Sequence, residues 1–156
     1  MSVAGSGPEL ARLEERCREL QIDRRVVFTG RLNSDEMRAL YRDADVFLNP
    51  SRVDNTPNSI LEALASEVPV VTTDVGGIPH LVKHRETALL VPPGDAQAMA
   101  EAVCEVLREP EATRSRVEAG RAISQRHSWS AVRPVLLALY QSLASRHFTA
   151  PSAQAK

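Results

Sequence analysis

The sequence predicts a doubly wound α/β fold, in which a parallel sheet lies between two layers of helices. Two observations lead to this prediction. Helical and strand patterns alternate four times between residues 10 and 91, and the strand segments are short, almost unbroken apolar runs. Such runs are typical of strands that are covered on both faces, as in three-layer parallel sheets.

The helices are predicted from apolar residues that recur at three- and four-residue steps. The first covers residues 10–20, and a second begins at the polar run 34–36. Thr56 is expected to cap a third helix with Pro57 at its first position, and a short fourth helix covers residues 78–83. After a strand remnant at residues 3–4, the predicted strands are 26–29, 46–48, 68–72 and 88–91.

The C-terminal third is predicted to be entirely helical. Asp95 caps one helix, a second follows Pro110, and a third covers residues 130–144 with Pro134 near its first turn. Residues 147–156 are expected to be a frayed tail. The 156 residues suit one domain, which we place at residues 1–146.

Composition excludes several classes of protein. Lys and Arg (19) almost balance Asp and Glu (20), which argues against nucleic-acid binding. Cys17 and Cys104 lie far apart on helical patterns, so both are interpreted as reduced, buried thiols. We find neither a membrane-spanning run nor a signal peptide, and therefore expect a cytoplasmic protein.

Ligands of open α/β sheets bind beyond the carboxyl ends of the strands, so the loops there are candidate sites. Gly5 and Gly7 precede the first helix, where backbone N–H groups could contact an anion. In the loop at residues 30–32, Gly30 could let the backbone N–H and C=O groups pair with a planar base. For both loops a plain turn is an equally good interpretation.

The loop at residues 50–57 is the most informative, because it carries a carboxylate into a helix N-terminus. Asp54 lies in this loop, and Glu62 follows eight residues later. The helix start at Asn58, Ser59 and Ile60 would favour a phosphate. The alternative is a well-capped helix without a ligand.

A further candidate loop contains Gly76 and Gly77, which either contact a ligand or turn the chain.

The string P-S-x-x-D-N-x-P-N-S-x-L-E-A-L-A-x-x-x-P-V-V-x-T-x-x-G-G-I-P, at residues 50–79, resembles the nucleotide-sugar-binding half of GT-B glycosyltransferases. The resemblance is to the retaining, metal-independent family 4 group. It continues over nearly the whole chain, from Gly5 to the S-W-S sequence at residues 128–130. It implies a Rossmann-like C-terminal GT-B domain and transfer of a sugar from a UDP-, GDP- or ADP-sugar to an acceptor hydroxyl.

The resemblance also implies roles for single residues. Asp54 would contact the donor sugar and Glu62 the ribose, and these two are the candidate catalytic residues. The other donor-binding candidates would hold the diphosphate or line the nucleotide cleft: Asn58, Ser59, Ile60, Gly5, Gly7, Gly30 and Arg31. No metal or other cofactor is implied.

The chain departs from the family pattern at several positions. Asp54 stands where glutamate is usual, Glu67 where glycine is usual, and His80 where another glutamate is usual. His80 either contacts the donor or is a surface residue, and the second interpretation is favoured.

Parts of a complete enzyme are not found in this sequence. Family 4 enzymes have an N-terminal domain that binds the acceptor, a glycan or glycolipid in polysaccharide biosynthesis, often at the inner membrane. The first strand–helix unit of the donor domain, which carries an Arg and Lys clamp, is also absent. By analogy, that strand would lie mid-sheet and leave two unpaired edges.

We therefore expect a chain that is inactive alone. We also expect that it rearranges its strands, forms a homodimer through these edges, or is poorly stable. Two alternatives stay open: a non-catalytic nucleotide-binding or protein-interaction module of the same fold, and a nucleotide-sugar epimerase.

Overall fold

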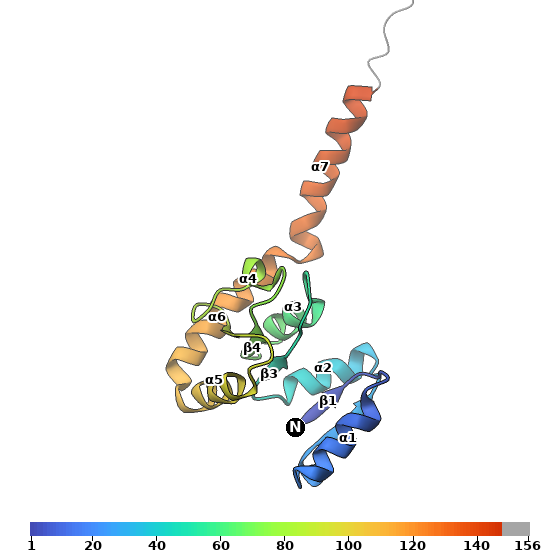
Figure 1. Ribbon diagram of the computed structural model, residues 1–156. Helices are drawn as coiled ribbons and strands as arrows, with labels where there is room; N and C mark the ends of the chain where they lie inside the picture. The colour runs from blue at the N-terminus through green and yellow to red at the C-terminus, as the bar shows by residue number, and fades with distance from the viewer. Residues whose placement is uncertain (148–156) are drawn as a thin grey trace, which may run out of the picture. The chain divides into compact units, whose positions relative to one another are not determined.

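The computed structural model describes residues 1–147, which form two compact units, each with its own parallel sheet (Figure 1). Unit 1 is Met1–Asp43, and unit 2 begins at Ala44. The sequence-based tail prediction for residues 148–156 lies outside the described residues. His147, which the sequence predicts to be the first residue of the tail, is the last residue of a helix.

Unit 1 contains two parallel strands and two helices. Its elements are β1 (Ser2–Ala4), α1 (Leu10–Glu19), a short 3-10 helix (Asp23–Arg25), β2 (Val27–Gly30) and α2 (Ser34–Arg42). Asn33 caps α2 by accepting hydrogen bonds from the N–H groups of Asp35 and Glu36, and the Glu36 carboxylate accepts one from the N–H of Asn33. This capping box explains why α2 begins where the polar run predicts a helix.

Unit 2 contains a three-stranded parallel sheet in the order β3-β4-β5. Its elements are β3 (Phe47–Asn49), α3 (Asn58–Ala65), β4 (Val70–Thr73), α4 (Ile78–Leu81), β5 (Leu89–Val91), α5 (Ala96–Arg108), α6 (Pro110–Arg126) and α7 (Trp129–His147). Helix α5 packs on β4 and β5, α3 contacts β4, and α3 also packs against α6. The core between sheet and α5 includes Val71, Leu89, Val91, Ala102 and Val106.

These elements confirm the predicted fold class: parallel strands alternate with helices on both sides of the sheet, and the C-terminal third is helical. Within residues 1–147, β1 pairs only with β2 and β3 pairs only with β4, so each of these two strands has an unpaired edge. The assignment of residues 1–146 to one domain and self-association through these edges stay predictions. No helix in residues 1–147 is both long and apolar enough to cross a bilayer.

Two local predictions were wrong. Cys104 is exposed, whereas Cys17 is buried. The buried face of α5 contains Ala102, and Cys104 lies two residues further on, about 200° around the helix at 100° per residue. Pro134 is the sixth residue of α7, beyond the first turn, so that its ring nitrogen leaves one helical hydrogen bond unmade.

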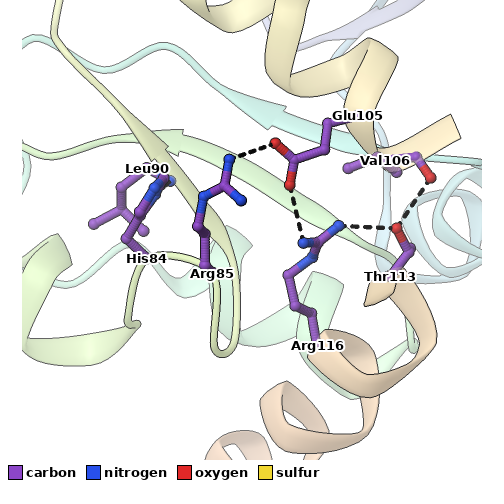
Figure 2. Close-up of polar contacts among 7 residues, drawn as sticks. All are labelled: His84, Arg85, Leu90, Glu105, Val106, Thr113 and Arg116. Carbon is purple, nitrogen blue, oxygen red and sulfur yellow. Dashed lines mark hydrogen bonds and ion pairs between the residues drawn. The ribbon is translucent and has the colours of Figure 1, made fainter. Parts of the chain in front are cut away.

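Arg116 joins α5 to α6 through a nearly buried ion pair (Figure 2). Its guanidinium donates to the Glu105 carboxylate at 3.1 Å and to the Thr113 hydroxyl at 3.1 Å. The Thr113 hydroxyl donates in turn to the Val106 carbonyl at 3.0 Å. Arg85, which is largely exposed, binds the other oxygen of Glu105 at 3.0 Å. Glu105 therefore connects both helices to the segment that precedes β5.

Glu67 adopts a backbone conformation that explains why glycine is usual at this position. Its φ is +59°, in the left-handed region that side chains with a Cβ adopt only at a cost. Its carboxylate contacts the Arg121 guanidinium at 2.7 Å, but both side chains are more than half exposed. An exposed pair of this kind contributes at most about 1 kcal/mol, so it only partly offsets the strain.

We therefore expect Glu67→Gly to raise the free energy of unfolding by about 0.5–1 kcal/mol, since relief of the strain outweighs the lost ion pair. Urea unfolding followed by circular dichroism measures this change. Arg121→Ala is the matched control: it removes the same ion pair without relieving the backbone and should be neutral or slightly destabilising. A Glu67→Gly protein less stable than Arg121→Ala would contradict the strain argument.

Candidate functional site

The loop at residues 50–57 is tied to the ends of two adjacent strands. Asn49, the last residue of β3, lies opposite Thr72 of β4. The Thr73 hydroxyl donates to the Ser51 carbonyl at 2.6 Å, and the Thr72 hydroxyl donates to the Asn49 carbonyl at 3.3 Å. These bonds fix the loop at the carboxyl edge of the sheet, where ligands of open α/β sheets bind.

Gly76 and Gly77 bring the loop after β4 against the backbone of the loop at residues 50–57. A Cβ at Gly76 would lie 1.9 Å from the Asp54 carbonyl oxygen, and one at Gly77 would lie 1.8 Å from that of Asn55. The Gly77 N–H donates to the Asp54 carbonyl at 3.1 Å. The two glycines therefore have a structural role that neither sequence-based interpretation included: they leave room for a neighbouring loop.

The two predicted acidic residues belong to the same unit. Asp54 is half-buried in the loop, and its carboxylate lies 3.4 Å from the Ser51 hydroxyl. Glu62 is the fifth residue of α3 and is exposed. The loop and the helix thus place one carboxylate before the helix N-terminus and the other beyond its first turn.

The N-terminus of α3 differs from the prediction. Pro57, with ψ of +116°, is in extended conformation and occupies the N-cap, so the first helical residue is Asn58. The N-cap residue makes no side-chain hydrogen bond to the helix, and the expected cap at Thr56 was wrong.

The Ile60 N–H, predicted to bind phosphate, already donates to the Pro57 carbonyl at 3.1 Å. The Ile60 side chain is fully buried in the core.

Unit 1 brings together most of its own candidate residues. The Gly5 N–H donates to the Gly30 carbonyl at 2.7 Å, and the Arg31 guanidinium donates to the Ser6 hydroxyl at 3.0 Å. The loops after β1 and β2 therefore lie side by side, as the parallel pairing of these strands requires. Gly7 accepts a bond from the Leu10 N–H at 3.3 Å, at the start of α1. The nucleotide-binding roles of these residues stay predictions.

Other polar features have no place in this site. His80 is exposed on α4, as favoured from the sequence. The Arg18 guanidinium donates to the Glu15 carboxylate, and this bond raises the pKa of Arg18. The pair is exposed on α1. Within residues 1–147, no three His, Cys, Asp or Glu side chains cluster in a way that could hold a metal ion.

Sequence reasoning missed Asn49, Ser51 and Thr73. Asn49 was interpreted only as the end of a strand, yet it is nine-tenths buried. The available signal was a polar residue at the end of an apolar strand, followed two residues later by a serine.

Comparisons of the sequence and of the fold with known proteins agree on one family. The profile of the family "Glycosyl transferases group 1" matches residues 1–109. The D-inositol 3-phosphate glycosyltransferase of Corynebacterium urealyticum is 35% identical over 141 residues, which are 90% of this chain and 33% of that protein.

Among solved structures, the sucrose-phosphate synthase of Thermosynechococcus elongatus is 31% identical with a TM-score of 0.84, over 93% of this chain and 38% of that one. Anabaena HepE in complex with UDP-glucose is 22% identical with a TM-score of 0.83, over 90% of this chain and 40% of that one, and this likeness shows the fold. The chain spans 27% to 37% of the length of the first curated relatives that it matches. The chain belongs to the glycosyl transferases group 1 family.

Proposed function

We propose that this chain is the nucleotide-diphospho-sugar-binding domain of a retaining, metal-independent glycosyltransferase of family 4. The observation that carries the proposal is the loop at residues 50–57, which is anchored to β4 and places Asp54 three residues before Pro57, the N-cap of α3. Such a helix N-terminus favours a negatively charged group through its N–H groups and its dipole. A diphosphate next to a carboxylate that accepts sugar hydroxyls fits this arrangement.

The residues of unit 2 have separate roles in this proposal. The Asp54 carboxylate accepts hydrogen bonds from hydroxyls of the donor sugar, and the Glu62 carboxylate accepts them from the ribose. The start of α3, at Asn58, Ser59 and Ile60, lies against the diphosphate. Because Ile60 already bonds to Pro57, its N–H is shared with the phosphate or exchanges its partner.

In the transfer step the bond between the anomeric carbon and the diphosphate oxygen breaks. The acceptor hydroxyl oxygen forms the new bond with retained configuration, and its proton passes to the leaving diphosphate. The contribution of this chain is to stabilise the negative charge that develops on the leaving diphosphate. Preorganised N–H groups and a helix dipole in a partly dry site perform this function well.

HepE has been crystallised with UDP and with UDP-glucose. We propose a nucleotide sugar of the same class here, with UDP, GDP and ADP as the candidate nucleotides. Acceptor binding, to a glycan or a glycolipid, is assigned to a further domain. This chain by itself is therefore proposed to bind a donor without transferring the sugar.

Isothermal titration calorimetry with UDP-, GDP- and ADP-sugars tests the donor-binding role. One nucleotide sugar is expected to bind the wild-type chain, and Glu62→Ala should weaken that binding at least about tenfold, because a hydrogen-bonded carboxylate contributes about 1.5–3 kcal/mol. Glu118→Ala, which removes an exposed carboxylate from α6, is the matched control and should bind like the wild type.

Failure of all the nucleotide sugars to bind would contradict the proposal and favour a protein-interaction module of the same fold. Equal losses in Glu62→Ala and Glu118→Ala would contradict the role of Glu62.

A further inference from the structure

The side chain of Asn49 contains a buried donor without an acceptor. Asn49 is 9% exposed, and its Nδ2 atom has no hydrogen-bond partner within the described part of the chain. Its Oδ1 atom accepts a hydrogen bond from the Ser51 hydroxyl at 2.7 Å. A buried donor without a partner costs about 1–3 kcal/mol, so this orientation of the amide is unfavourable.

The Ser51 hydroxyl lies near two acceptors but has one proton to donate. Its oxygen is 2.7 Å from Oδ1 of Asn49 and 3.4 Å from Oδ2 of Asp54. While the proton is donated to Asn49, the Asp54 carboxylate receives no hydrogen bond from Ser51. In this orientation of the Asn49 amide, the side chains of Asn49, Ser51 and Asp54 therefore share a single hydrogen bond.

Exchanging the oxygen and nitrogen of the Asn49 amide removes the conflict. The two atoms have nearly the same shape, and their assignment follows from the hydrogen-bond network. After the exchange, Nδ2 donates to the Ser51 oxygen, and the Ser51 proton is donated to Asp54. Two hydrogen bonds replace one, although the second, from the Ser51 hydroxyl to the Asp54 carboxylate, is long at 3.4 Å. The atom without a partner is then a carbonyl oxygen, which folded proteins tolerate better than an unpaired N–H.

We propose that Asn49 is a positioning residue for Asp54, acting through a relay in which Asn49 Nδ2 donates to Ser51 Oγ and Ser51 Oγ donates to Asp54 Oδ2. The role of the relay in donor recognition rests on the proposed function, which assigns Asp54 to the donor sugar. The Thr73 hydroxyl donates a hydrogen bond to the Ser51 carbonyl oxygen at 2.6 Å. This bond anchors the relay to β4. The relay contributes to binding of the donor sugar, whereas binding of the nucleoside diphosphate does not depend on the relay.

The direction of the relay is tested without any ligand, by NMR on the ¹⁵N-labelled chain. The side-chain NH₂ protons of Asn49 should show nuclear Overhauser contacts to the Ser51 β-protons and should exchange slowly with water. Ser51→Ala should shift these NH₂ signals and speed their exchange at least about tenfold. If the chemical shifts and exchange rates of the Asn49 NH₂ protons are unchanged in Ser51→Ala, the relay is overturned.

Recognition of the sugar is tested by calorimetry with UDP-glucose and with UDP. Asn49→Leu and Ser51→Ala should each weaken UDP-glucose binding about tenfold and leave UDP binding within about twofold. Ser51→Thr keeps the hydroxyl and should restore UDP-glucose binding to within about threefold of the wild type. Ser115→Ala, at an exposed serine of α6, is the control.

Parallel losses of UDP-glucose and UDP affinity would show a merely structural role and overturn the proposal. A wild-type chain that binds none of the UDP-, GDP- and ADP-sugars would refute the proposed function, and the NMR result would then decide the relay by itself. If Asn49→Leu does not fold, Ser51→Ala and Ser51→Thr give the same comparison.

Discussion

Gly77→Ala is expected to lower the free energy of unfolding of unit 2 by about 3 kcal/mol or more, because the new methyl group would overlap a backbone atom. Its Cβ would lie 1.8 Å from the Asn55 carbonyl oxygen, which belongs to a loop anchored in the sheet. The φ of Gly77 is −85°, a value open to any residue. The requirement for glycine is therefore one of space alone. Urea unfolding followed by circular dichroism measures the loss.

Gly7→Ala is the matched control for this prediction. Its Cβ would have no atom within 4 Å, and its φ lies outside the left-handed region. We expect a change of at most about 1 kcal/mol in either direction. If Gly77→Ala unfolds at the same urea concentration as Gly7→Ala, the close packing of the two loops does not exist in solution.

Arg116→Met is expected to destabilise unit 2 by about 2–4 kcal/mol, because it leaves the Glu105 carboxylate without its buried partner. The Arg116 side chain is 9% exposed and that of Glu105 is 19% exposed. Methionine retains the apolar stem, so the effect reports mainly the lost charge and hydrogen bonds. The midpoint of urea unfolding provides the measurement.

Arg85→Met tests the same carboxylate from its exposed side. Arg85 is 64% exposed, and an exposed ion pair contributes at most about 1 kcal/mol. Its loss should therefore be clearly smaller than that of Arg116→Met. Combining Arg116→Met with Glu105→Leu should recover part of the stability, since no unpaired charge is then buried. Equal losses for the two single variants would refute the role of burial in this network.

The alternation of helices and strands was predictable because each element carries its own period. Apolar residues at helical spacing predicted α1, α2 and α5, and Pro110 predicted the start of α6. Short apolar runs predicted the strands to within two residues. The cap at Asp95 was predictable for the same reason, since its carboxylate accepts from the Ala98 N–H within the same turn. Local signals of this kind need no knowledge of the tertiary structure.

Features that depend on a neighbouring segment were not predictable. The reason for Gly76 and Gly77 lies in the backbone of residues 54–55, which is distant in sequence. The burial of Asn49 depends on the pairing of β3 with β4. The start of α3 was misplaced because Pro57 fits both the N-cap and the first turn, and only its ψ value decides between them. Tertiary contacts determine these features, whereas the sequence pattern is local.

The most direct test of donor binding by unit 2 is an NMR titration of the ¹⁵N-labelled chain with UDP-glucose. We expect saturable shifts of the backbone amide signals of Asp54, Asn58, Ser59 and Glu62. Titration with UDP alone should shift the amide signals of Asn58 and Ser59 and leave the Asp54 amide signal nearly unchanged. Amides of the distant α5–α6 junction, such as that of Thr113, should not move. If no UDP-, GDP- or ADP-sugar shifts the amides of residues 54–62, donor binding by unit 2 is contradicted.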